Sequence, residues 1–153
     1  MTTFEEILAR DGILVYKTSG RSMEPLLRQD RDLVVISAFS SRLQKNDVAL
    51  YKRGNQVVLH RVIKVMPDHY LIRGDNTYTL EKVPDSAVLG VMTAFKRKGR
   101  EYQTTDKSCQ RYVRFWNAVY PLRYTLFRLK GFLLAAARRT GLTPLLKKIL
   151  HKS

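Results

Sequence analysis

Three side chains of this chain have the chemistry of acyl transfer: a serine, a histidine and an acidic residue, in that order. Ser22 lies in the segment SGRSMEP, His60 in LHR and Asp75 in GDN. A serine hydroxyl is a poor nucleophile at neutral pH and needs a neighbouring base to take its proton. An imidazole can act as that base, and a carboxylate behind it can hold its tautomer and stabilise the imidazolium. The pattern therefore predicts acyl transfer, with peptide-bond hydrolysis as the favoured reaction.

These three residues adjoin segments that have the composition of β-strands. The segments are rich in β-branched residues and are separated by turn formers, without helices between them, so we expect an antiparallel, mainly β domain. A short helix is expected before them, because Thr3 and Glu6 have capping-box spacing and Gly12 follows. Strands are expected at residues 13–16, 33–36, 48–51, 57–59, 61–65, 70–72 and 87–91.

Each candidate residue also has a purely structural interpretation. Gly20 and Pro25 bracket Ser22 and predict a sharp turn that lifts its side chain into a cleft, but a serine there can also simply cap the turn. His60 ends an apolar run and can be a buried strand histidine. Asp75 has the type and the neighbours of a hairpin-turn residue. The order of the motifs favours the catalytic interpretation of Ser22 and His60.

The same motifs resemble the superfamily of type I signal peptidases and LexA-like peptidases. The similarity rests on SGRSMEPL, followed by DLVVI, NDVALY, VLHRV and RGDN, and it covers residues 13–95. Most bacterial signal peptidases and LexA-like proteins have a lysine where this chain has His60. The endoplasmic-reticulum and archaeal branch has a histidine in a His-Arg-Val motif, as here. The resemblance implies a serine endopeptidase with a LexA- and signal-peptidase-like β domain.

The resemblance also implies roles for individual residues. Ser22 corresponds to the nucleophile and His60 to the general base. Asp75 and Glu81 are alternative acidic partners of the histidine, and the sequence does not choose between them.

The expected oxyanion and substrate-binding residues are Ser22, Met23 and Gly20. The backbone N–H of Ser22 is the expected main oxyanion donor, and Met23 is expected to pack beneath the site. Gly20 stands where some signal peptidases have a serine that helps to bind the oxyanion. Arg21 separates Gly20 from Ser22, and this spacing is closer to that of LexA than to that of most signal peptidases.

The charge of the chain is concentrated in its second half. Residues 1–95 contain 13 basic and 11 acidic residues, whereas residues 96–153 contain 15 and 2. The second segment therefore contributes +13 of the total net charge of +15. We expect a peptidase domain at residues 1–95 and a basic, amphipathic, α-helical extension at residues 96–153, which would bind an anionic partner.

The extension has the pattern of helices that lie on a membrane surface. Its leucines recur with helical spacing at 122, 126, 129 and 133, and a last helix is expected to begin at Thr143–Pro144. Arginine and lysine interrupt the apolar run, and each would cost about 2.5–3.5 kcal/mol at mid-bilayer, so we expect no spanning helix. Leucines and aromatics mixed with cations favour an anionic membrane surface, and packing on the β domain is the alternative. Nucleic acid is not the expected partner, because no nucleic-acid-binding motif accompanies the charge.

The N-terminal residues, the single cysteine and the spacing of the histidines indicate the compartment and the need for cofactors. Residues 1–20 lack the apolar segment of a secretory signal, which predicts a cytoplasmic protein or one peripheral to the cytoplasmic membrane. Cys109 is the single cysteine, so an intramolecular disulfide is excluded. The histidines and the cysteine do not have metal-ligand spacing, and neither a metal nor another cofactor is expected.

Two other functions are compatible with these observations. The SGRSM spacing suggests a LexA-like regulator that cleaves itself, although only 21 residues precede Ser22 and the chain contains neither an Ala-Gly nor a Cys-Gly bond. The other is a non-catalytic binding protein, in which the basic tail binds lipid or nucleic acid and the β domain is a degenerate peptidase.

Overall fold

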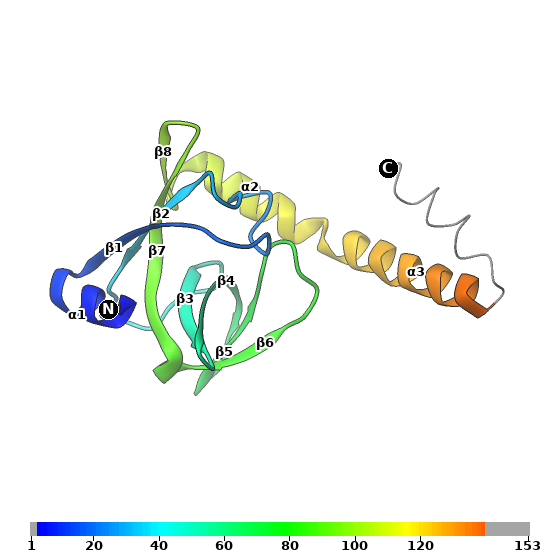
Figure 1. The fold of residues 1–153 in the computed structure, drawn as a ribbon, viewed down its shortest axis with the longest axis horizontal. Helices are drawn as coiled ribbons and strands as arrows, with labels where there is room; N and C mark the ends of the chain where they lie inside the picture. The colour runs from blue at the N-terminus through cyan, green and yellow to red at the C-terminus, as the bar shows by residue number, and fades with distance from the viewer. Residues whose placement is uncertain (1–2, 140–153) are drawn as a thin grey trace. The chain divides into compact units, whose positions relative to one another are not determined.

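In the computed structural model, which describes residues 3–139, eight strands form one curled antiparallel sheet (Figure 1). Neighbouring strands follow the order β1-β2-β7-β3-β4-β5-β6, and β8 pairs with the C-terminal part of β7. This arrangement confirms the predicted antiparallel, mainly β domain. The strands are β1 (Ile13–Lys17), β2 (Leu33–Ser37), β3 (Val48–Arg53), β4 (Gln56–Val65), β5 (His69–Arg73), β6 (Glu81–Pro84), β7 (Val88–Arg97) and β8 (Arg100–Gln103).

The curled sheet buries apolar side chains in two clusters, one formed with helix α1 (Phe4–Asp11) and one enclosed by β3 to β7. Strand β7 belongs to both, because it pairs with β2 and with β3. Close packing at this junction requires Gly90, since a Cβ there would lie 2.5 Å from the Cγ2 atom of Ile36. The first cluster includes Leu8, Leu14, Leu27, Val34, Ile36, Leu50 and Phe95, and the second Ala49, Tyr51, Val62, Tyr70, Ile72 and Val83.

Helix α1 begins and ends as its sequence predicts. The Thr3 side chain accepts a hydrogen bond from the Glu6 N–H, and the Glu6 side chain accepts one from the Thr3 N–H, which is the reciprocal capping box. Gly12 ends the helix in the left-handed region at φ 70°. The helix places the Phe4 ring against the ring of Tyr16, with 5.2 Å between the ring centroids.

The strands differ from the predicted ones in number and in their bounds. The segments predicted separately at residues 57–59 and 61–65 form the single strand β4, so His60 lies inside a continuous strand. Strands β6 and β8 were not predicted, because each has only four residues and few apolar ones, and they form by pairing with β5 and β7.

The basic segment after residue 95 begins in the sheet and continues as helices. Strand β7 runs on to Arg97 and turns through Lys98 and Gly99, both at positive φ, into β8. The boundary predicted from charge at residue 95 thus lies within β7, because solvated basic side chains also occur on the exposed ends of strands.

Helices follow the hairpin as α2 (Lys107–Ala118) and α3 (Tyr120–Arg139). The chain divides into two units, the first ending at Val113 and the second beginning at Arg114. The helix predicted to begin at Thr143–Pro144 lies outside the described residues. Among residues 3–139, no helix has both the length and the apolar composition that crossing a bilayer requires.

Candidate active site

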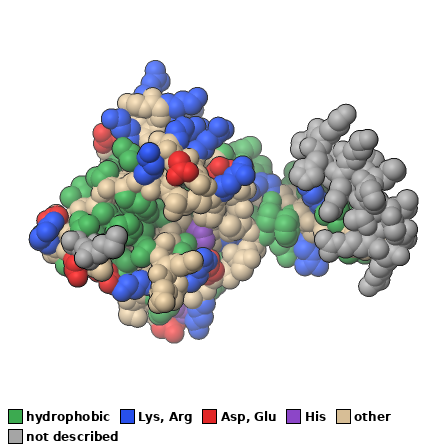
Figure 2. All heavy atoms as spheres, in the orientation of Figure 1, with side chains coloured by type: hydrophobic (Ala, Val, Ile, Leu, Met, Phe, Trp, Pro, Cys, Tyr) green, Lys and Arg blue, Asp and Glu red, His purple; other side chains and the backbone are tan. Residues whose placement is uncertain are grey.

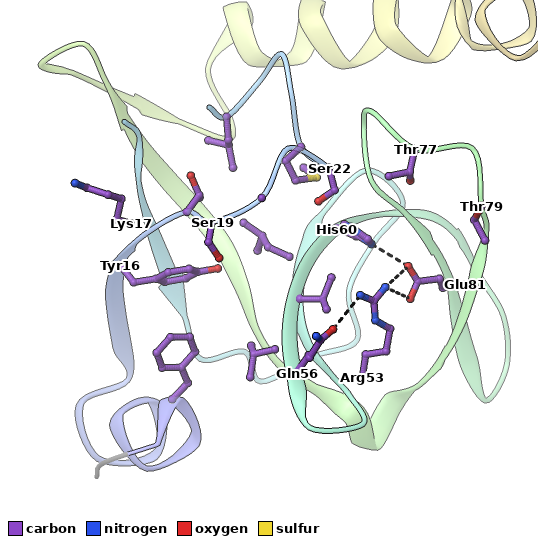
Figure 3. A pocket seen from close by; sticks show the side chains of 18 residues that line it. Tyr16, Lys17, Ser19, Ser22, Arg53, Gln56, His60, Thr77, Thr79 and Glu81 are labelled. Atoms are coloured by element: carbon purple, nitrogen blue, oxygen red, sulfur yellow. Dashed lines mark hydrogen bonds and ion pairs between the residues drawn. The ribbon is translucent and has the colours of Figure 1, made fainter. Parts of the chain in front are cut away.

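The predicted nucleophile and base line the same cleft, which has a volume of about 1030 Å³. Ser22 lies in the loop after β1, His60 lies on β4, and Glu81 is the first residue of β6. Figure 3 shows the Ser22 side chain beside the His60 ring, with Glu81 on the other side of that ring. Tyr16 and Lys17 lie on the opposite wall of the cleft. Residues distant in the sequence therefore come together around one cavity.

The loop that carries Ser22 is held by hydrogen bonds from the segment after β5. The backbone N–H of Asn76 donates to the carbonyl oxygen of Ser22 at 2.7 Å, and its side-chain amide donates to the carbonyl oxygen of Arg21 at 3.2 Å. Met23 is buried and lines the cleft, and Gly20 also lines it, with φ at 83°. A left-handed conformation of this kind is open to glycine without strain.

The backbone N–H of Ser22 fits the predicted oxyanion donor. Among the residues that the structure describes, this N–H has no hydrogen-bond partner. A donor without an internal partner, next to the nucleophile in a cleft, can bind the oxygen that becomes negative during acyl transfer.

His60 and Ser22 approach one another closely at Gly74. A Cβ at Gly74 would lie 2.6 Å from the carbonyl oxygen of Ser22 and 3.1 Å from the Nε2 atom of His60. Gly74 is therefore the spacer that allows the serine loop and the histidine ring to meet. In the described part of the chain the Ser22 hydroxyl makes no hydrogen bond with His60.

The far side of the His60 ring contacts a carboxylate and a phenol. Its Nδ1 atom lies 3.2 Å from Oε1 of Glu81 and 3.1 Å from the hydroxyl oxygen of Tyr51. The Tyr51 hydroxyl donates its single proton to Oε2 of Glu81 at 2.9 Å, and burial, together with the Glu81 carboxylate, raises the pKa of Tyr51. Because Tyr51 has no second proton to give, Nδ1 of His60 must be the donor, which leaves the Nε2 lone pair facing Ser22.

Burial keeps His60 neutral, since only 4% of the residue is exposed. Burial is the largest influence on the pKa of His60 and lowers it below the ordinary value; the Glu81 carboxylate raises this pKa, and the Arg53 guanidinium lowers it. Arg53 also donates to both carboxylate oxygens of Glu81, at 3.2 and 3.3 Å. A neutral imidazole at neutral pH is the form that can accept a proton from serine.

Asp75, the other acidic candidate, has a different partner. Its carboxylate receives two hydrogen bonds of 2.7 Å from Arg61 and one of 2.9 Å from the hydroxyl of Tyr112 in α2. Arg61 and Asp75 are both buried, and Arg61 also donates to the carbonyl oxygen of Asn46. Of the two acidic residues that the sequence left open, Glu81 lies against the His60 ring. Asp75 binds Arg61 and Tyr112 instead, and it holds the segment after β5 that contacts the Ser22 loop.

Tyr51 and Arg53 were not among the sequence candidates. The signal that identifies Tyr51 is the hairpin register, because Ala49 pairs with His60 and Tyr51 follows two residues later on the same face. Arg53 lies on the same face two residues beyond Tyr51, but its contact is with Glu81, which the chain brings to this place only through β6.

Within residues 3–139, no group of three or more histidine, cysteine, aspartate or glutamate side chains is arranged to hold a metal ion.

Comparison with known proteins gives no further assignment. The chain matches no model of a known protein family, and no curated protein sequence matches it.

Proposed function

We propose that this chain is a serine endopeptidase in which Ser22 is the nucleophile, His60 the general base and Glu81 the residue that orients the base. The observation that carries the proposal is the meeting of three groups in one cleft: the Ser22 loop and His60 Nε2 at Gly74, and Glu81 at Nδ1. Serine hydrolases need this order of nucleophile, base and acid.

The proposed reaction follows the usual course of acyl transfer. The Oγ atom of Ser22 bonds to the carbonyl carbon while its proton passes to Nε2 of His60, and the carbonyl electron pair moves to the oxygen, which the Ser22 N–H binds. The carbon–nitrogen bond then breaks, and the departing amine takes the proton from Nε2. Water then attacks the acyl carbon and gives a proton to Nε2 of His60. The bond between that carbon and Oγ of Ser22 breaks, and Oγ takes the proton back. Substrate binding would bring Oγ and Nε2 within hydrogen-bond distance, since catalytic contacts often tighten only in the complex.

The cleft suits a peptide in extended conformation. Among the described strands, β1 pairs only with β2, and residues 56–60 of β4 pair only with β3, so each has one free edge. Residues of both segments line the cleft, on the opposite walls seen in Figure 3. An extended peptide can add to a free strand edge through its main chain, which holds the scissile bond in place.

We further infer that the curled sheet is a signal-peptidase-like and LexA-like domain of the Ser–His type. The support is the order of the motifs over residues 13–95 and the position of the serine loop beside the histidine. Glu81, in place of Asp75, is then the acidic residue of the site.

Cleavage profiling of a diverse peptide pool by mass spectrometry tests the proposal. The wild type should cut peptides, Ser22→Ala should not, and Ser19→Ala, a serine in the same cleft, should cut like the wild type. The intact mass of the wild type after long incubation is measured in parallel. Undiminished cutting by Ser22→Ala would refute the serine mechanism, and loss of full-length wild type without cleavage of other peptides would favour the self-cleaving regulator.

A further inference from the structure

The leucine stripe of α3 is exposed. It consists of Leu122, Leu126, Leu129 and Leu133, which are 63, 56, 51 and 41% exposed. These positions recur at i, i+4, i+7 and i+11 and therefore share one face of the helix. An uncovered apolar face of this length marks an interaction surface.

Aromatic side chains extend the apolar surface beyond the stripe. Phe115, Phe127 and Phe132 are also exposed, and Figure 2 shows hydrophobic and basic side chains on the surface of α3. Trp116, the single tryptophan of the chain, lies under the guanidinium of Arg123, 3.8 Å from the ring centroid. Tryptophan, phenylalanine and leucine combined with cations are typical of helices at the boundary between lipid headgroups and acyl chains.

The charge of the helices identifies the partner. Residues 107–139 contain eight lysines and arginines and neither aspartate nor glutamate. Arg123 and Lys130 each follow a stripe leucine by one residue, so they flank the stripe on the same side. The long aliphatic stem of Lys130 can lie along the apolar face while its ammonium reaches outward to phosphate groups, and Arg123 holds its charge at the Trp116 ring.

The same charge disfavours the other occupants of this face. A second copy of the chain would bring eight cations against eight, with no carboxylate between residues 107 and 139 to offset them. Nucleic acid would neutralise the cations but would leave the leucines without an apolar partner. A bilayer with anionic lipids satisfies both requirements, because headgroups neutralise the cations and acyl chains cover the leucines.

We propose that α3 docks the protein on the surface of an anionic phospholipid membrane. The leucine stripe enters the headgroup boundary, and Arg123 and Lys130 bind lipid phosphates. The helix lies along the surface. Docking does not require catalysis at Ser22, so it stands or fails separately from the peptidase function.

Flotation with lipid vesicles tests the proposal on the full-length chain. The wild type should float with mixed phosphatidylcholine–phosphatidylglycerol vesicles, and not with phosphatidylcholine alone. Added salt should weaken binding, since the cations contribute through headgroup attraction. The fluorescence of Trp116 should shift to shorter wavelength on binding. Ser22→Ala should bind like the wild type.

Variants identify the face that binds. The double variant Leu126→Gln and Leu129→Gln should lose binding about tenfold or more, because two leucines no longer enter the apolar region. Arg123→Gln with Lys130→Gln should lose the preference for phosphatidylglycerol. The matched control is Val15→Gln, which replaces an equally exposed apolar residue on β1 and should bind like the wild type. Circular dichroism verifies that each variant is folded.

Three results would overturn the proposal. One is binding of the leucine variant equal to that of the wild type. Another is absence of vesicle binding by the wild type. The third is loss of all vesicle binding when DNA competes, with a tight DNA complex that the leucine substitutions leave unchanged.

Discussion

At the scale of single residues, the chemistry of the cleft depends on which proton His60 carries. Burial and Arg53 favour the neutral ring, whereas Glu81 favours the imidazolium. The Tyr51 hydroxyl donates its only proton to Oε2 of Glu81, so it can only accept a hydrogen bond from His60. The proton of the neutral His60 ring is therefore on Nδ1. A base of this kind can accept the serine proton at neutral pH and still be stabilised once it is charged.

Replacing Glu81 tests the orienting role. Glu81→Gln should lower kcat/KM for a cleaved peptide by about 10²–10⁴-fold, because the imidazolium formed during attack loses its countercharge. Steady-state kinetics measures the loss. The control is Glu101→Gln, an exposed carboxylate on β8, which should leave the kinetics unchanged. A loss below threefold in Glu81→Gln would rule out the orienting role.

Replacing Arg53 should shift the pH dependence in the opposite direction from replacing Glu81. Wild-type kcat/KM should rise with pH on an acid limb below the ordinary histidine pKa of about 6.5, since burial lowers the pKa of His60. Removing the Arg53 charge in Arg53→Gln should raise this pKa and move the limb to higher pH. Glu81→Gln should move it to lower pH.

NMR titration measures the pKa of the His60 ring directly, without a substrate, and His60→Asn identifies its signals. The pKa should be highest in Arg53→Gln, intermediate in the wild type and lowest in Glu81→Gln. Shifts of the same sign in Arg53→Gln and Glu81→Gln would contradict the opposed-charge account.

At the scale of elements, the site depends on how β4, the segment after β5 and α2 are connected. Arg61 of β4 and Tyr112 of α2 both bind Asp75, and the adjacent Asn76 holds the Ser22 loop. The charged cluster therefore connects the core of the first unit to the loop that carries Ser22, the proposed nucleophile.

Breaking this cluster should cost stability. Asp75→Asn should lower the free energy of unfolding by about 3–5 kcal/mol, because the buried Arg61 charge loses its countercharge. Urea unfolding measures the change. The exposed pair Arg42–Asp85 is the control, and Asp85→Asn should cost less than about 1 kcal/mol. Equal costs for the two variants would show that Asp75 is not a structural anchor.

At the scale of the whole molecule, the buried histidine links the stability of the fold to pH. Below pH 6.5 the unfolded chain binds a proton at His60, whereas the folded protein does so only below its lowered pKa. The contribution of His60 to the free energy of unfolding is therefore fully present above about pH 6.5. It decreases as the pH falls from there toward the pKa of His60 in the folded protein.

The expected slope in this window is up to about 1.4 kcal/mol per pH unit for one proton. Urea unfolding at a series of pH values between about 5 and 7.5 measures it. His60→Asn should show a flatter profile over this interval, since it has no proton to bind at that position. An unchanged slope in His60→Asn would assign the pH dependence to other groups.

Local patterns in the sequence determine much of this molecule. The capping box of α1, most strands, the helical spacing of the leucines in α3 and the serine and histidine motifs all depend on neighbours within a few residues. Such patterns are readable because side-chain periodicity and capping act over one or two turns of chain. They also indicate the antiparallel architecture, since closely spaced strands leave no room for crossover helices.

Only the tertiary structure decided which acidic residue lies against the His60 ring. Asp75 follows a strand and has the expected sequence context, yet curling of the sheet turns its carboxylate to Arg61, while the short strand β6 brings Glu81 to Nδ1. Strand β6 exists through its pairing with β5, and the sheet's curvature depends on packing of both cores. Neither can be inferred from residues close in sequence, because the energies that select them come from contacts between distant segments.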